Sequence, residues 1–139
     1  MSTALIIVDI QNDYFPNGKM ELSKPELAAA NAAKVLDWFR KNTKDSVYHV
    51  QHIASDPALG FFLPDTTGAE IRKTVLPLEN ETVVTKSFAN SFLETGLESK
   101  LRENGVTKVV IIGMMTHMCI DATVRAAVDL GFEAVLIED

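Results

Sequence analysis

Residues 108–119, with the sequence KVVIIGMMTHMC, indicate the fold of this chain more clearly than any other stretch. After Lys108 comes the continuous apolar run Val-Val-Ile-Ile, which is typical of a strand buried on both faces. Residues 113–116, Gly-Met-Met-Thr, predict a sharp turn out of that strand. A helix is then expected to begin near His117, because apolar residues recur at helical spacing at Ile120, Val124, Ala127 and Val128. A buried strand that turns directly into an amphipathic helix is typical of α/β proteins.

Strand and helix patterns alternate along the rest of the chain in the same way. Short apolar runs predict strands over residues 5–8, 46–53, 82–85, 107–112 and 134–137. Helices are expected over residues 23–41, over residues 97–103, and from the region of Cys119 to Gly131. This alternation predicts a single domain over residues 1–139 with an α/β fold, a three-layer, doubly wound (Rossmann-like) parallel sheet with helices on both faces.

The first two expected helices carry capping signals in the sequence. Ser23 with Glu26, and Thr95 with Glu98, have the spacing of a capping box, which predicts where each helix begins. Trp38 falls within the first helix and is expected to pack in the core or against a neighbouring helix.

The composition excludes several classes of protein. Of the 139 residues, 47% are hydrophobic and 23% are charged, which is ordinary for a globular domain. The net charge of −6, without a basic stripe, argues against nucleic-acid binding. The apolar run Ala4–Val8 is too short for a membrane span and is followed by Asp9, so we expect neither a signal peptide nor a membrane anchor. A single cysteine permits no internal disulfide, and we expect a cytoplasmic protein.

Three chemically capable side chains follow expected strands, at the edge where parallel sheets bind their ligands. Asp9 follows the first strand, Lys86 follows the third, and the fourth leads to Cys119. A position in the first turn of a helix favours the thiolate form of Cys119. Asp9 is suited to take the thiol proton, and Lys86 is suited to keep Asp9 ionised. The alternative is that Cys119 is a small buried hydrophobe.

The least regular segment, residues 54–81, contains the apolar cluster Phe61-Phe62-Leu63. Loops of this length in compact domains are usually functional or locally structured. The cluster is therefore expected either to pack on its own domain or to form a pocket wall or a subunit contact.

Three motifs resemble those of the isochorismatase-like cysteine hydrolase family. Residues 8–15, VDIQNDYF, look like its first motif, and residues 86–92, KSFANSF, resemble its lysine motif. Residues 113–119, GMMTHMC, are similar to its G-x-x-T-x-x-C nucleophile turn. The order and the approximate spacing of the motifs also agree with the family, and the resemblance covers nearly the whole chain.

The resemblance implies a catalytic triad of Asp9, Lys86 and Cys119. It also implies a non-proline cis peptide between Met114 and Met115, and an oxyanion hole formed by the backbone N–H groups of Met115 and Cys119. Family members usually continue through a further strand and helix, so we expect this chain to lack those C-terminal elements. Related enzymes are commonly oligomeric, and we expect a homo-oligomer, with the Phe61-Phe62-Leu63 cluster as a candidate contact.

One departure from the family concerns metal binding. Nicotinamidase-type members hold a metal through an Asp-x-His motif after the second strand, whereas this chain has HIASDP at residues 52–57. His49 and His52 are three apart on a strand and therefore point to opposite faces. We expect no metal and no other cofactor, and we do not expect nicotinamidase activity.

These observations predict a metal-independent hydrolase of a small molecule that cleaves an amide-like C–N bond through a thioester-type intermediate on Cys119. The enzymatic alternative is vinyl-ether hydrolysis of isochorismate, with Asp9 as general acid and no bond to sulfur. The non-enzymatic alternative is a redox-sensing or ligand-binding domain with a reactive Cys119, although the sequence offers no second thiol. Side chains beside the three motifs are expected to contact the substrate, namely Phe15, Phe88, His117 and Met118.

Overall fold

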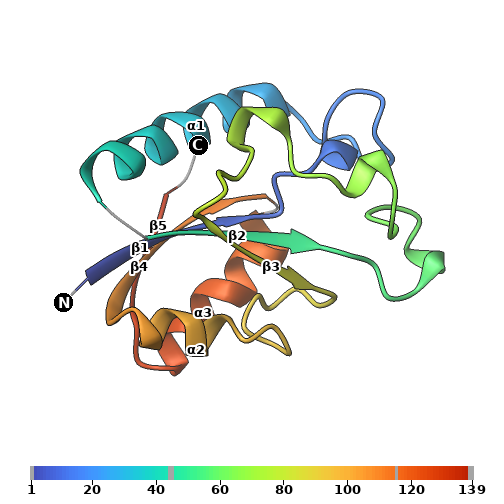
Figure 1. The fold of residues 1–139 in the computed structure, drawn as a ribbon. Helices are drawn as coiled ribbons and strands as arrows, with labels where there is room; N and C mark the ends of the chain where they lie inside the picture. The colour runs from blue at the N-terminus through green and yellow to red at the C-terminus, as the bar shows by residue number, and fades with distance from the viewer. Residues whose placement is uncertain (1, 44–45, 115, 138–139) are drawn as a thin grey trace.

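A parallel sheet forms the centre of the molecule in the computed structural model, which describes residues 2–43, 46–114 and 116–137 (Figure 1). The five strands lie in the order β3-β2-β1-β4-β5. Every pairing within the sheet is parallel. The strands are β1 (Ser2–Val8), β2 (Val47–His52), β3 (Thr82–Lys86), β4 (Val106–Gly113) and β5 (Glu133–Leu136).

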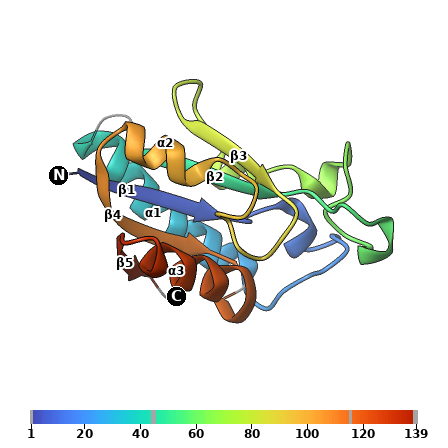
Figure 2. The same cartoon turned by 90° about the horizontal axis from the view of Figure 1, so that it is seen from below.

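Helices cover both faces of this sheet, which confirms the predicted three-layer fold. The long helix α1 (Pro25–Asn42) lies on one face, and α2 (Leu97–Glu103) and α3 (Asp121–Asp129) lie on the other (Figures 1 and 2). A five-residue π-helix, Thr116–Ile120, leads into α3. Single-turn 3₁₀ helices occur at Asn12–Tyr14, Pro57–Leu59, Thr67–Ala69 and Lys73–Val75. No helix in the described part of the chain is both long and apolar enough to cross a membrane.

Each face of the sheet has its own hydrophobic core because side chains alternate along a strand. On β1, Leu5 and Ile7 belong to the core beneath α1, whereas Ile6 and Val8 belong to the core shared with α2 and α3. All four side chains are almost fully buried. The central strand is therefore apolar on both faces, as its sequence predicts.

The order of the strands fixes where a ligand can bind. The chain builds outward from β1 through β2 to β3 and then returns to place β4 on the other side of β1. Doubly wound sheets usually bind their ligands at such a reversal, beyond the carboxyl ends of the two strands that flank it, which here are β1 and β4. In register, Val8 pairs with both Val50 and Gly113, and His52 pairs with Lys86, so these strand ends share one edge.

The predicted capping boxes are wrong, although both helices begin close to the expected residues. The N-cap of α1 is Lys24 in a left-handed conformation, with Pro25 as the first helical residue and no capping bond from a side chain. The N-cap of α2 is Gly96, also left-handed. Thr95 instead accepts a hydrogen bond from the Leu97 N–H at 3.2 Å.

The prediction for Trp38 is also wrong in part, because 57% of this residue is exposed. Its ring contacts the neighbouring Phe39 edge-on, and Phe39 is the residue that enters the core. In α3, Val128 is similarly exposed, whereas Ala127 is fully buried.

Candidate active site

Asp9 stands at the end of the central strand in an unusual backbone conformation. Its φ is 57°, in the left-handed region, which Asp tolerates better than most residues. The Asp9 N–H still donates to the Val50 carbonyl at 3.0 Å, so the residue remains anchored to β2. Non-glycine residues in this region cost free energy and cluster at functional sites. The carboxylate of Asp9 lies beside Lys86, His52 and Cys119.

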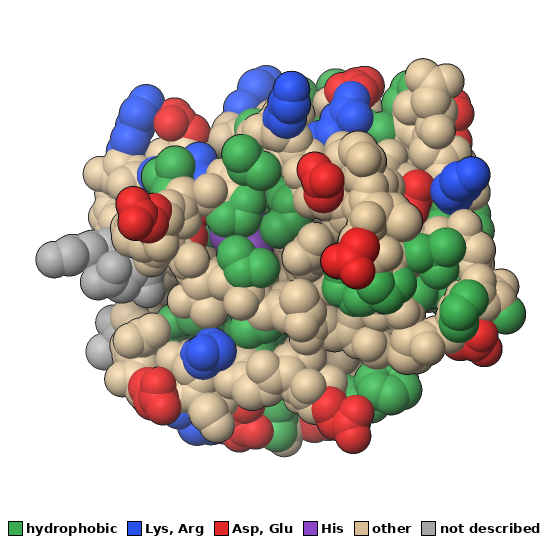
Figure 3. All heavy atoms as spheres, turned by 45° about the vertical axis from the view of Figure 1, so that its right-hand side comes forward, with side chains coloured by type: hydrophobic (Ala, Val, Ile, Leu, Met, Phe, Trp, Pro, Cys, Tyr) green, Lys and Arg blue, Asp and Glu red, His purple; other side chains and the backbone are tan. Residues whose placement is uncertain are grey.

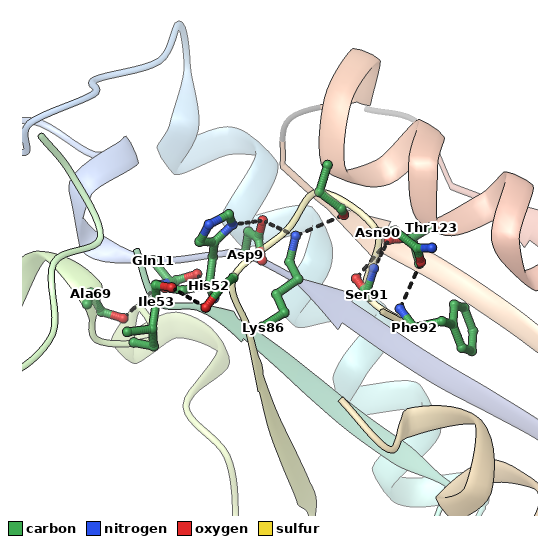
Figure 4. A network of polar contacts seen from close by, with 12 residues as sticks. Asp9, Gln11, His52, Ile53, Ala69, Lys86, Asn90, Ser91, Phe92 and Thr123 are labelled. Atoms are coloured by element: carbon green, nitrogen blue, oxygen red, sulfur yellow. Dashed lines mark hydrogen bonds and ion pairs between the residues drawn. The ribbon is translucent and has the colours of Figure 1, made fainter. Parts of the chain in front are cut away.

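Lys86, the last residue of β3, contacts that carboxylate. Its Nζ atom lies 3.1 Å from Asp9 Oδ2, and both side chains are fully buried. The ammonium also donates to the Ala89 carbonyl at 3.0 Å, which holds it from a second side. Figure 4 shows Lys86 and His52 on opposite sides of Asp9. The structure thus brings together Asp9 and Lys86, two of the three predicted catalytic side chains, although their strands β1 and β3 lie on either side of β2.

Cys119 reaches the same carboxylate from the π-helix that follows β4. Its sulfur, a carboxylate oxygen of Asp9 and a ring nitrogen of His52 all lie within 4.8 Å of one another. The helix predicted to begin near His117 therefore starts with the π-helix Thr116–Ile120 in the described part of the chain. The regular α-helix α3 begins only at Asp121. Cys119 is buried, with 5% of its surface exposed.

A close approach between β1 and β4 sets the position at which the chain leaves β4 and leads to Cys119. The Met114 N–H donates to the Val8 carbonyl at 3.0 Å. A Cβ atom on Gly113 would lie 2.0 Å from that carbonyl oxygen, so only glycine fits there. Val8 immediately precedes Asp9. The contact therefore ties the end of β4 to the strand end that carries the acid.

Burial controls the protonation of the acid and the thiol. It raises the pKa of Asp9 to about 6, against the opposing charge of Lys86. Burial, together with the negative charge of Asp9, raises the pKa of the Cys119 thiol to about 12. At neutral pH the resting pair is therefore an ionised Asp9 and a protonated Cys119. This differs from the expected thiolate, because desolvation outweighs any effect of the helix end.

His52 is a further site residue that the sequence reasoning considered only as a metal partner for His49. It ends β2, and its Nδ1 atom lies 3.9 Å from Asp9 Oδ2. The Gln11 side chain holds its backbone, accepting from the His52 N–H and donating to the His52 carbonyl, each at 2.8 Å. Burial and the charge of Lys86 lower the pKa of His52 to about 4, so it is neutral at pH 7. His49 contacts Glu81 instead, at 2.8 Å.

A pocket of about 230 Å³ opens above Cys119, and its lining is mostly apolar. Phe88 and Met118 line it, which places two of the four predicted substrate contacts on its wall. Phe15 is instead fully buried in the α1-side core, with the Arg72 guanidinium 4.2 Å from its ring centre. On the face turned forward in Figure 3, a small area of histidine side chain (purple) is visible between hydrophobic side chains (green). The other lining residues are Tyr14, His52, Ala54, Ser55, Asp56, Leu59, Phe61, Phe62, Ser87 and Ala89.

The aromatic loop packs on its own domain and also forms the pocket wall. Phe62 is fully buried, and its ring lies edge-on to Tyr14 with centroids 4.8 Å apart. Its backbone has a left-handed φ of 56° and donates to Asp13 Oδ2 at 2.7 Å. The other oxygen of Asp13 accepts from the Lys19 N–H at 3.1 Å. Asp13 is thus a structural acid that fixes Phe62 beside the site.

Three sequence predictions fall on residues beyond this description. Met115 lies outside the described residues, so the Met114–Met115 cis peptide and the Met115 half of the oxyanion hole stay predictions. The His117 side chain also lies outside what the structure describes. The homo-oligomer stays a prediction as well.

The chain matches the family model of the isochorismatase domain over residues 3–139. It is 57% identical to the uncharacterised isochorismatase family protein YddQ of Bacillus subtilis (strain 168), over all of this chain and 77% of that protein. An isochorismatase from Pseudomonas putida KT2440 of known structure is 35% identical, with a TM-score of 0.89, over 99% of this chain and 69% of that chain.

A second solved structure is that of N-carbamoylsarcosine amidase from Thermoplasma acidophilum. It is 25% identical, with a TM-score of 0.87, over 99% of this chain and 82% of that chain. The family model and the sequence identities agree with the observed fold. The chain belongs to the isochorismatase family and is a hydrolase of that family.

Proposed function

We propose that this hydrolase cleaves the C–N bond of a small, largely apolar amide through a covalent intermediate on Cys119. The observation that carries the proposal is the position of the Asp9 carboxylate, which lies 3.1 Å from the Lys86 ammonium and within 4.8 Å of the Cys119 sulfur, and Cys119 in turn lines an apolar pocket. Covalent catalysis by a protonated thiol requires such an adjacent base. No step of the proposed reaction requires a metal.

The first half of the reaction forms a thioester. As the sulfur of Cys119 attacks the amide carbonyl carbon, its proton passes to the Asp9 carboxylate. The resulting tetrahedral intermediate collapses, the C–N bond breaks, and protonated Asp9 gives the proton to the leaving nitrogen. A pKa of about 6 suits both roles of Asp9, because a group that accepts and returns a proton near neutral pH works best when its pKa is near that pH.

The second half of the reaction reverses these roles with water. Asp9 takes a proton from a water molecule as its oxygen attacks the thioester carbonyl. The C–S bond then breaks, the carboxylic acid product leaves, and the sulfur recovers its proton from Asp9. Lys86 holds Asp9 in place and keeps its pKa from rising further. The resemblance to the family assigns the oxyanion to the N–H groups of Met115 and Cys119.

The pocket indicates the size and polarity of the substrate. Its volume of about 230 Å³ is below the usual range for drug-sized ligands, about 300–1,000 Å³. Phe61, Phe62, Phe88 and Met118 offer apolar walls, and neutral His52 offers a hydrogen-bonding nitrogen. A short apolar acyl group fits such walls better than a charged one. The relative named N-carbamoylsarcosine amidase supports amide chemistry on this fold.

The test is a hydrolysis screen on the wild type and on Cys119→Ala, with small amides such as butyramide and benzamide and with isochorismate. We expect the wild type to hydrolyse an amide and Cys119→Ala to lose that activity by about 10⁴-fold or more, because removing the nucleophile of a catalytic triad has effects of this size. Retained amide hydrolysis in Cys119→Ala would end the covalent mechanism. Isochorismate turnover by both proteins would instead support the general-acid alternative.

A further inference from the structure

Asp9, His52 and Cys119 place three different metal-binding groups at one point. One ligand atom from each residue lies within 4.8 Å of the other two. Oδ1 of Asp9 and Nδ1 of His52 are buried and have no hydrogen-bond partner among the described residues, whereas Oδ2 of Asp9 is held by its ion pair with Lys86 at 3.1 Å. Buried polar atoms without partners are rare in folded proteins, and each one calls for an explanation. Here an unpartnered carboxylate oxygen and an unpartnered imidazole nitrogen lie beside a thiol.

The donor set selects the kind of ion. A carboxylate oxygen, an imidazole nitrogen and a thiolate sulfur suit Zn²⁺, whereas Mg²⁺ and Ca²⁺ prefer oxygen alone. Bonds of about 2.0–2.3 Å place the ligands of a tetrahedral zinc ion about 3.5 Å apart. The distance of 3.9 Å between His52 Nδ1 and Asp9 Oδ2 is already close to this value. A small movement of the Cys119 sulfur toward Asp9 and His52 would bring all three ligand atoms to the spacing of a zinc site.

The charge balance permits a divalent cation despite the neighbouring lysine. With Cys119 deprotonated, the two negative charges of Asp9 and Cys119 face the single positive charge of Lys86, and His52 is neutral. Lys86 can also keep its bond to the Ala89 carbonyl if Asp9 turns toward the ion. The pocket borders both His52 and Cys119, so a fourth position can be taken by water.

We propose that Asp9, His52 and Cys119 form a three-ligand Zn²⁺ site that switches the hydrolase off. When the S–Zn bond forms, the thiol proton passes to solvent and no redox change occurs. The ion then binds both the nucleophile, Cys119, and its base, Asp9, so neither can react with a substrate. This site differs from the Asp-x-His metal site of nicotinamidase-type relatives, because two of its ligands are the proposed catalytic groups themselves.

The test measures zinc binding in the absence of any substrate. The rate of Cys119 alkylation by iodoacetamide is followed by intact mass, with and without Zn²⁺, in the wild type, His52→Ala and the control Asp56→Asn. Asp56 lines the same pocket but lies outside the three-ligand cluster. Binding of Co²⁺ supplies a second readout, through the absorption band of a cobalt–thiolate bond. Circular dichroism checks that each variant is folded.

We expect Zn²⁺ to protect Cys119 at low concentration in the wild type and in Asp56→Asn. His52→Ala should need about 100-fold more zinc, because losing even an indirect partner of a ligand costs about 10- to 100-fold in metal affinity. Mg²⁺ should give no protection. The proposal is overturned if zinc gives no protection, if it protects folded His52→Ala equally well, or if Asp56→Asn loses protection. None of these results depends on whether the protein hydrolyses amides.

Discussion

The Lys86 Nζ atom lies 3.1 Å from Asp9 Oδ2, and neither side chain has any exposed surface. A buried ion pair is weak evidence for stability, because removing two charges from water costs about as much as their attraction returns. Its effect on the acid is better defined, since the charge of Lys86 opposes the rise in the Asp9 pKa that burial causes. The pair thus keeps a deeply buried carboxylate ionised at neutral pH.

Replacing Lys86 should therefore change the pH dependence of the reaction. In Lys86→Met, the loss of the positive charge raises the pKa of Asp9 above its value of about 6. The acid limb of kcat/KM against pH should move upward by about 1 to 3 pH units, the usual effect of a close opposite charge. Lys108→Met, which alters a partly exposed lysine paired loosely with Glu133, is the control and should leave the limb in place. An unmoved limb in Lys86→Met would contradict the assignment of Asp9 as the titrating base.

Replacing Asp9 should separate thiol reactivity from turnover. The negative charge of Asp9 is, after burial, the main cause of the high Cys119 pKa. Asp9→Asn removes this charge, so the pKa of the thiol falls and iodoacetamide labelling at pH 8 becomes faster. Hydrolysis should nevertheless fall by about 10²- to 10⁴-fold, the usual contribution of a general base. Labelling that slows in Asp9→Asn would contradict the charge balance described for the site.

Because Gly113 lies directly against β1, replacing it with alanine should lower the free energy of unfolding strongly. In Gly113→Ala the new methyl group meets the Val8 carbonyl oxygen at 2.0 Å, and the free energy of unfolding should fall by about 3 kcal/mol or more. Gly131→Ala is the matched control, because its φ of +94° is also positive but no atom lies within 4 Å of the added carbon. That variant should lose only about 1 kcal/mol. Urea unfolding of both proteins checks the difference, and equal losses would contradict the close approach.

A second buried acid, Glu81, predicts how stability depends on pH. It accepts two bonds from Arg40 at 2.7 Å and contacts His49 at 2.8 Å. Although burial raises the Glu81 pKa, these bonds, together with one from the Leu78 N–H, lower it to about 2. An acid whose pKa is lowered by folding stabilises the protein above its ordinary pKa of 4.5, and this contribution is lost as the pH falls through about 2.

Glu81→Gln should therefore reduce the free energy of unfolding at pH 7 by about 2 kcal/mol, as expected for a lost charge-assisted hydrogen bond. Between pH 5 and pH 2 its stability should fall less steeply than that of the wild type. Glu133→Gln alters an exposed acid and should follow the wild type. Urea titrations at several pH values give the curves. Parallel curves for Glu81→Gln and the wild type would show that the Glu81 carboxylate does not contribute to the pH dependence of stability.

The sequence predicted the sheet well because its strands are continuous apolar runs. A strand such as residues 5–8 can be buried only between two layers, and this requirement alone implies helices on both faces. The helix starts were harder to predict, because Lys24 and Gly96 take left-handed backbone conformations that the capping-box pattern does not encode. Trp38 shows a different limit, since the helical period places Phe39 on the buried face but does not reveal that the neighbouring Trp38 stays largely exposed.

The site was predicted in part. Rules for parallel sheets and the family motifs both pointed to Asp9, Lys86 and Cys119, and the structure brings these side chains together. His52 was missed because its role depends on β2 lying beside β1, which brings the end of one strand to the other. The protonated state of Cys119 was missed as well. It depends on the burial of the whole site, which a helical position does not reveal.

Reaction of the protein with p-nitrophenyl butyrate, an activated ester with a short apolar acyl group, shows directly whether Cys119 is the nucleophile. The wild type should release a burst of p-nitrophenolate equal to the enzyme concentration, and intact mass should show one butyryl group on Cys119. Cys119→Ala should show neither the burst nor the adduct. A burst of equal size in Cys119→Ala, or an adduct on another residue of the wild type, would show that Cys119 is not the nucleophile.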